Sequence, residues 1–306
     1  MHRGTMPKSL RLARQNIALY FLLLPACAYI LLLNYFPMYG IQIAFRDFSF
    51  SKGITGSPWV GLKWFRTFFN SPQAMRLIGN TLALSLYSLI AGFPIPVLLA
   101  LVMHNLPSRG LRRISQTITY LPHFISTVVL VGMMNCFFSV NGGFINTLIS
   151  MLGMHPVYFM GETKYFRHLY VWSGIWQNAG WSSIIYLAAL TGISQELHEA
   201  AMIDGANKLQ RIWHIDLPGI LPTMVTLLIL NSGNILSVGF EKVYLMQNSL
   251  NHSVSDILST YTYDYGILRT RYSYSAAIGL FNNVVNFSIL VLVNAISRRL
   301  SETSLW

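Results

Sequence analysis

Charge is absent from long stretches of this sequence, and this feature limits the possible folds more than any other. Six stretches of at least 24 residues contain no Asp, Glu, Lys or Arg: 15–45, 77–108, 114–161, 168–195, 217–240 and 272–297. Charged residues make up 10% of the chain and hydrophobic residues 53%, whereas an average soluble protein has about 25% charged residues. A soluble surface needs far more charge than this. The sequence therefore predicts an integral membrane protein.

Each charge-free stretch can hold one membrane-spanning helix, which needs about 20 mostly apolar residues. We place six helices near 17–36, 79–103, 114–138, 169–191, 218–240 and 276–297. Beyond the third helix, residues 144–160 contain Gly153, His155 and Pro156, so a short interfacial or re-entrant segment is expected there. The predicted fold is all-α, in three parts: a cytoplasmic N-terminal segment 1–16, a six-helix membrane domain 17–297 and a cytoplasmic tail 298–306.

The basic residues predict the orientation of these helices. Clusters flank helix ends on one face: Arg11 and Arg14, then Arg109, Arg112 and Arg113, then Arg298 and Arg299. With the N-terminus inside, the cytoplasmic segments hold 11 Lys and Arg in 61 residues, and the outer segments hold 10 in 107. The positive-inside rule therefore favours both termini in the cytoplasm. Anchoring at the headgroups of the lipid bilayer explains the net charge, and no motif indicates nucleic acid as a partner.

Signatures of enzymes and metal sites are missing from the sequence. No G-x-x-x-x-G-K-[ST] loop is present, so the chain is not expected to bind ATP in the P-loop manner. His198 and Glu199 begin like the zinc motif H-E-x-x-H, but Met202 occupies the position of the second histidine. We therefore predict no catalytic residues, no metal site and no cofactor bound by this chain.

The longest predicted cytoplasmic loop, residues 192–217 between helices 4 and 5, contains two short amphipathic helices. Asp204 and Gly205 form a turn pair that ends the first helix, and Asn207 can cap the second. Pro218 is tolerated in the first turn of the next span. From periodicity alone, an amphipathic connector lying on the bilayer is as good an interpretation as a functional element.

The residues of this loop resemble the EAA loop of permease subunits of type I ABC importers. That motif reads E-A-A-x-x-x-G, followed about nine residues later by I-x-L-P. The fuller form E-A-A-x-x-D-G-A is typical of the carbohydrate-uptake branch. The matching residues here are Glu199, Ala200, Ala201, Asp204, Gly205, Ala206, Leu217 and Pro218. One departure is that His214 and Asp216 flank Ile215, where more apolar or varied residues are common.

The resemblance extends over most of the chain. Segments 35–40, 43–47 and 59–62 look like the permeases that serve oligosaccharides released from complex polysaccharides. Asn80-Thr81-Leu82 and Tyr120-Leu121-Pro122 are also similar to the family. The resemblance implies a multi-pass protein of the bacterial cell membrane that imports an oligosaccharide.

The resemblance also implies partners and a mechanism. A second related permease completes the pathway, two ATPase subunits bind ATP and Mg²⁺ below it, and an extracytoplasmic solute-binding protein delivers the sugar. The EAA loop then acts as a coupling element that seats in a groove of the ATPase. The alternative is an ATP-independent channel or secondary carrier for a polar solute. The six predicted spans contain no Asp, Glu, Lys or Arg, only His123, which favours the importer.

Polar and aromatic residues of the last three spans form a candidate substrate path. Asparagines at helical spacing are placed at one depth, where their amides suit sugar hydroxyls: Asn231 and Asn234 on the fifth span, Asn282, Asn283 and Asn286 on the sixth. Trp172 and Trp176, four residues apart, could stack on a sugar ring. Two alternatives stay open, because Asn often bonds helices together and Trp is enriched at membrane interfaces.

Overall fold

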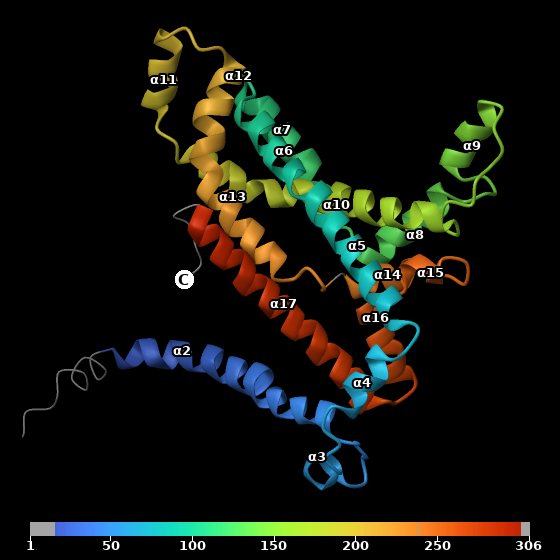
Figure 1. Ribbon diagram of the computed structural model, residues 1–306. Coiled ribbons are helices and arrows are strands. Elements are labelled where there is room, and N and C mark those ends of the chain that lie inside the picture. The colour runs from blue at the N-terminus through green and yellow to red at the C-terminus, as the bar shows by residue number, and fades with distance from the viewer. Residues whose placement is uncertain (1–15, 238, 301–306) are drawn as a thin grey trace, which may run out of the picture.

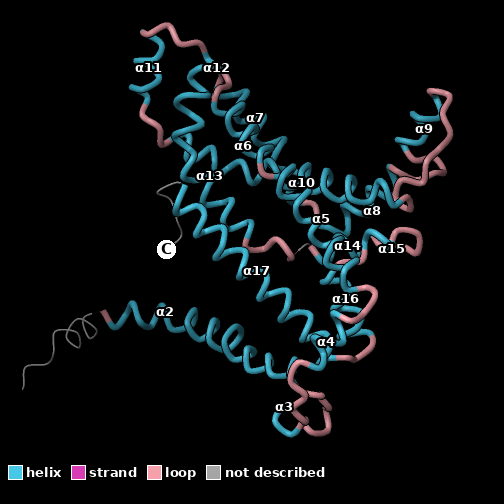
Figure 2. Tube along the Cα trace, in the orientation of Figure 1, coloured by secondary structure: helices cyan, strands magenta, loops and turns pink. Residues whose placement is uncertain are grey.

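The computed structural model describes residues 16–237 and 239–300. The predicted segment 1–16 and tail 298–306 therefore lie largely outside the described residues. The described part is helical, and one isolated bridge, Arg46 to Trp59, is the β-type pairing found in it (Figures 1 and 2).

The first half of the chain forms helices up to α9. They are α2 (Ile17–Ile30), π-helical η1 (Leu31–Tyr35), 3₁₀-helical η2 (Phe36–Phe45), α3 (Gly53–Gly56), α4 (Lys63–Phe69), α5 (Ala74–Gly92), α6 (Pro94–His104), α7 (Arg109–Tyr120), 3₁₀-helical η3 (Leu121–Phe124), α8 (Thr127–Phe137) and α9 (Phe144–Met151).

The second half begins with the long helix α10 and ends with the equally long α17. Its elements are α10 (Thr163–Thr191), α11 (Gln195–Ile203), α12 (Lys208–Arg211), π-helical η4 (Ile212–Asp216), α13 (Leu217–Ser232), α14 (Phe240–Met246), α15 (His252–Ser255), α16 (Leu258–Tyr263), π-helical η5 (Asp264–Leu268) and α17 (Tyr272–Leu300).

Four helical runs of the described chain are long and apolar enough to cross a membrane: Ile17–Phe45, Ala74–His104, Lys208–Ser232 and Tyr272–Arg299. They coincide with the first, second, fifth and sixth predicted helices. A fifth candidate is the bent pair Arg109–Phe124 and Thr127–Phe137. The fourth predicted helix coincides with α10, whose 29 residues include Gln177, Asn178 and Ser183 and which is not among the apolar candidates.

The third predicted helix is broken, so the prediction of one continuous helix near 114–138 is wrong. Its two halves meet at an angle of 96°. Pro122 lies at the start of η3 and cannot donate a backbone hydrogen bond. Ser126 then accepts a hydrogen bond from the backbone N–H of Val129 and caps a new helix, α8.

The fifth predicted helix ends early, so its predicted continuation to Phe240 is also wrong. α13 ends at Ser232, and Gly233 is its C-cap. The backbone N–H of Leu236 then donates to Asn286 Oδ1 at 2.8 Å, a bond that replaces helical pairing. Asn234 therefore lies beyond the end of α13, and its predicted helical spacing from Asn231 no longer holds.

Helices α5, α6, α10, α13 and α17 form the body of the protein, while α2 extends away from it (Figure 1). α10 packs across α5 and α6, and α13 lies along α17. α2 contains no buried residue. The segment α11–α12 is at one end of the body, and α15 with α16 is near the opposite end (Figure 1). The fold therefore places these two segments far apart, with the helices between them.

Candidate functional site

A cavity of about 690 Å³ opens between α5, α6, α10 and the end of α13. Asn231 and Asn234, two predicted substrate-path residues, line it with exposed side chains. The other polar residues that line it are Ser85, Ser88, Tyr170, Trp181, Ser182, Tyr186 and Ser237. Hydroxyl and amide groups on an apolar wall can bind a polyhydroxylated ligand.

The asparagines of α17 are placed differently. Asn282 and Asn283 are not among the residues that line this cavity. The neighbouring Asn286 is buried, accepts a hydrogen bond from Leu236 N–H at 2.8 Å and donates to Ser237 Oγ at 2.9 Å. Asn286 thereby bonds α17 to the segment that follows α13. The structure thus brings two of the five predicted asparagines to the cavity.

Trp172 and Trp176 line a second, apolar cavity of about 430 Å³ between α8 and α10. Trp172 Nε1 donates to Tyr87 Oη at 2.9 Å. The tryptophan that lines the main cavity is Trp181, which the sequence analysis did not select. Trp181 stacks on His123, with ring centroids 4.7 Å apart and planes inclined by 5°. The polar residues of α10 beside it are the sequence signal that could have identified this face.

In the loop 192–217, α11 is a separate short helix as the sequence predicts, whereas α12 continues through η4 into α13. Gly205 has a φ of +80°, a left-handed conformation in which glycine carries no steric cost. Asn207 and Gln210 form a reciprocal capping box at the start of α12. Glu199, Ala200 and Asp204 are exposed, and Ala201 and Ala206 are half-buried.

Apolar side chains of this loop lack partners within the described chain. Ile203 is 87% exposed, and Leu209 and Trp213 are also largely exposed. Leu217 packs against the core cluster at this end of the helices, and Pro218 lies in the first turn of α13. A set of apolar residues exposed on one loop is typical of a surface that contacts another molecule.

A buried carboxylate, Asp216, connects this loop to the helices. Asp216 Oδ1 lies 3.3 Å from His198 Nε2 of α11, and Oδ2 accepts from Asn105 Nδ2 at 3.2 Å. With His104, these side chains place ligand-type atoms within 4.8 Å of one another. Two imidazoles and a carboxylate could hold a zinc-type ion. In the sequence, Asp216 stands out only as a departure from the EAA motif, and the absence of a metal site stays a prediction.

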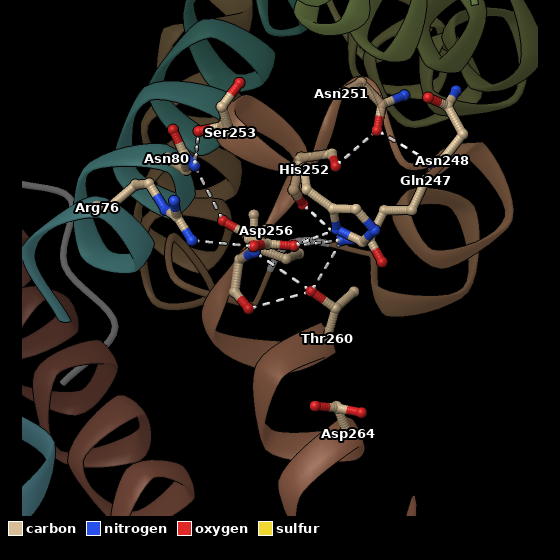
Figure 3. A network of polar contacts seen from close by, with 12 residues as sticks. Arg76, Asn80, Gln247, Asn248, Asn251, His252, Ser253, Asp256, Thr260 and Asp264 are labelled. Atoms are coloured by element: carbon tan, nitrogen blue, oxygen red, sulfur yellow. Dashed lines mark hydrogen bonds and ion pairs between the residues drawn. The ribbon is translucent and has the colours of Figure 1, made fainter. Parts of the chain in front are cut away.

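A network of polar contacts within residues 247–260 is joined to α5 (Figure 3). Asp256 accepts from Arg76 Nη2 at 3.3 Å and from His252 Nδ1 at 2.7 Å. Asn80 donates to the backbone oxygens of Ser253 and Asp256, at 3.0 and 3.1 Å. Figure 3 shows these side chains converging on one turn of the chain.

A bundle of apolar helices with a polar-lined cavity and an exposed two-helix loop has the form of a membrane permease. The chain belongs to the family of binding-protein-dependent transport system inner membrane components, whose family model matches residues 92–302. It is therefore a membrane-spanning permease of an ABC importer, not an enzyme. This membership supports the predicted importer and not the alternative of an ATP-independent channel or carrier.

Similar proteins cover nearly the whole chain. Protein LplB of Bacillus subtilis (strain 168) is 43% identical over 288 residues, covering 94% of this chain and 91% of LplB. The polygalacturonan/rhamnogalacturonan transport system permease protein YteP of the same organism is 42% identical over 292 residues, covering 95% of this chain and 91% of YteP.

A solved structure matches as well. It is the crystal structure of a bacterial ABC transporter involved in the import of the acidic polysaccharide alginate. One of its chains is 41% identical, has a TM-score of 0.89, and is matched over 96% of this chain and 100% of its own length. A second structure of a bacterial alginate ABC transporter, in complex with an alginate pentasaccharide-bound periplasmic protein, is 40% identical, also has a TM-score of 0.89, and is matched over 96% of this chain and 99% of its own length.

Proposed function

We propose that this chain is one of two permease subunits of a bacterial importer that carries an oligosaccharide into the cytoplasm. The observation that carries this proposal is the similarity to the alginate importer, at 41% identity over 96% of this chain. The polar cavity beside Asn231 and Asn234 agrees with a sugar substrate. A periplasmic solute-binding protein delivers the oligosaccharide, as in the complex with the alginate-bound protein.

In this proposal the chain spans the inner membrane six times, with α10 and the bent pair of helices as two of the spans. A six-helix domain at 17–297 then lies between a cytoplasmic segment at 1–16 and a cytoplasmic tail at 298–306. Loop 192–217 is the EAA loop and faces the cytoplasm. The density of basic residues on this side supports that orientation.

The exposed loop couples the permease to two ATPase subunits, which bind ATP and Mg²⁺. This chain binds no cofactor of its own. Ala200 and Ala201 allow the backbone to approach a preformed groove, and Glu199 is free to form an ion pair there. Gly205 makes the turn between the two helices. Closure of the ATPases on ATP pulls the loops of both permeases together. This motion changes the side of the membrane to which the cavity opens.

The coupling role is tested at Gly205. Because its φ is +80°, Gly205→Pro is strained, while Gly205→Asn keeps a residue that tolerates this conformation. We expect Gly205→Pro to abolish sugar-stimulated ATP hydrolysis in the reconstituted complex and Gly205→Asn to keep most of it. Co-purification of the ATPase is measured in parallel. Wild-type hydrolysis by the proline variant would refute the coupling role.

The orientation is tested with single cysteines at Leu209 and Lys52, both exposed. The native cysteines Cys27 and Cys136 are exposed too and are first replaced by serine. In sealed cells, an impermeant thiol reagent is expected to label position 52 and not position 209. Labelling of position 209 from outside would overturn both the orientation and the coupling role.

A further inference from the structure

A buried lysine lies beside the main cavity without a carboxylate partner. Lys242, on α14, is 7% exposed. Its Nζ donates to the backbone oxygen of Tyr170 at 2.8 Å and lies 4.9 Å from the centroid of the Tyr170 ring. Across residues 16–237 and 239–300, Lys242 forms no ion pair within 4.0 Å. Lysine is almost never buried in this way unless it is paired.

The surroundings of Lys242 leave room for a ligand. Lys242 lines a cavity of about 360 Å³ with Gly174, Gln177 and Asn178. A Cβ at position 174 would lie 3.2 Å from Nζ, so glycine keeps the space beside the ammonium group open. This cavity shares six lining residues with the main cavity: Ser88, Gly92, Pro96, Tyr170, Ser182 and Gly239. The cavity that Lys242 lines therefore adjoins the main cavity, which Asn231 and Asn234 line.

The ammonium group of Lys242 has hydrogen-bond donors that are not used. It carries three N–H donors, and one of them bonds the Tyr170 oxygen. Burial lowers the pKa of Lys242 from 10.5 to about 8, so at neutral pH the group is still mostly protonated. A buried cation with free donors is best stabilised by an anion that enters the cavity, since a charge-assisted hydrogen bond is roughly twice as strong as a neutral one.

We propose that Lys242 binds a carboxylate of an acidic oligosaccharide as it crosses the cavity, forming a subsite that favours uronate-containing sugars over neutral ones. The inference rests on the proposed oligosaccharide import and names its substrate class. The polar neighbours of Lys242 are uncharged: Gln177 donates to the Ile125 oxygen, and Asn178 donates to the Gly174 oxygen. Lys242 is thus the charged group of this subsite.

A purely structural lysine would behave differently. If Lys242 only held α14 against α10 through the Tyr170 oxygen, its replacement would slow the uptake of every sugar equally. A carboxylate subsite predicts that the loss depends on the charge of the sugar. The comparison of two probes of equal length therefore separates the two roles.

The experiment uses the complete transporter in proteoliposomes, with trigalacturonate and its carboxyl-reduced neutral trisaccharide as probes. Each probe is supplied at a concentration that saturates the binding protein, as measured separately. Lys242→Met keeps an unbranched side chain without charge, and Lys242→Arg keeps the charge. We expect Lys242→Met to lower trigalacturonate uptake about tenfold, to leave neutral uptake within about twofold, and Lys242→Arg to retain the preference.

Each outcome decides the question. Equal loss of both probes with Lys242→Met, or no loss of either, overturns the subsite and leaves the importer standing. If the wild type takes up only the neutral probe, the carboxylate subsite is likewise overturned and the importer function is not. Uptake of neither probe by the wild type would overturn the proposed sugar class together with the subsite.

Discussion

The polar groups of the network around Asp256 differ from those beside the main cavity and the loop 192–217 in how completely the chain satisfies their hydrogen bonds. In the Asp256 network, the side chain of Asn251 is fully buried and forms four hydrogen bonds, and Asp256 accepts from Arg76 and His252. Asp216, in contrast, contacts one histidine and one amide, and Lys242 uses one of its donors. A saturated network holds a scaffold in place. Polar groups with hydrogen-bonding positions left unused are those that a moving segment or a bound ligand can contact.

The largest effect on stability is expected from the saturated network. Asn251→Ala removes hydrogen bonds to Met160 and Met246 oxygens and from Asn248 N–H and Ser255 Oγ. We expect a loss of about 3–4 kcal/mol in the free energy of unfolding. Thermal unfolding in detergent measures it, with exposed Asn283→Ala as the control. An unchanged midpoint of unfolding would show that the Asp256 network does not stabilise residues 247–260.

The next effect is expected at the less saturated cluster. Asp216→Asn removes the charge that His198 and Asn105 contact, bonds worth about 1.5–3 kcal/mol for a charged group. Hydrogen exchange of the amides in α11 should accelerate about tenfold or more. The unfolding midpoint should fall less than with Asn251→Ala. Glu196→Gln is the control, because Glu196 is an exposed residue of α11. Equal exchange rates of the α11 amides in both variants would contradict the attachment of α11 through Asp216.

A smaller effect is expected from pH at Lys242. Its pKa of about 8 lies below the usual 10.5, so the side chain loses its proton as pH rises from 7 to 9. Tyr170 packs against it and the neighbouring Glu241 is exposed. The preference for trigalacturonate over the neutral trisaccharide should therefore fall by up to about tenfold over this range. Lys242→Arg should abolish the pH dependence, and a wild-type preference that is constant over this range contradicts it.

The smallest effect is expected among the asparagines. Asn234→Ala removes an amide from the cavity, while Asn283→Ala removes one that does not line it. We expect the apparent affinity for transported sugar to fall about fivefold for Asn234→Ala and to stay unchanged for Asn283→Ala, since one neutral hydrogen bond contributes about 1 kcal/mol. Uptake measured at several sugar concentrations tests both. The reverse order would move the sugar site to α17.

The sequence predicted those structural features that depend on residues close to one another along the chain. The charge-free stretches predicted the apolar helices, and the Asp204–Gly205 pair predicted the turn between α11 and α12. Pro122 was visible in the third stretch, but its consequence depends on the cap that Ser126 provides. The cluster of His104, His198 and Asp216 joins residues up to 112 positions apart, which only the packing of α6 against the loop brings together. Trp181 lines the cavity for a similar reason, because the path of α10 determines which face of this helix packs against α5 and α6.

The solitary position of α2 has a consequence for how the protein is made. None of its residues is buried against the described part of the chain, and the run Ile17–Phe45 contains no Asp, Glu, Lys or Arg. Its first part can therefore enter the bilayer as soon as it leaves the ribosome, because its contacts with lipid require no later segment. α10 is the opposite case, since its polar face needs α5 and α6 beside it. Insertion of α2 is thus independent of the later helices, whereas the polar centre forms only after the middle of the chain has been synthesised.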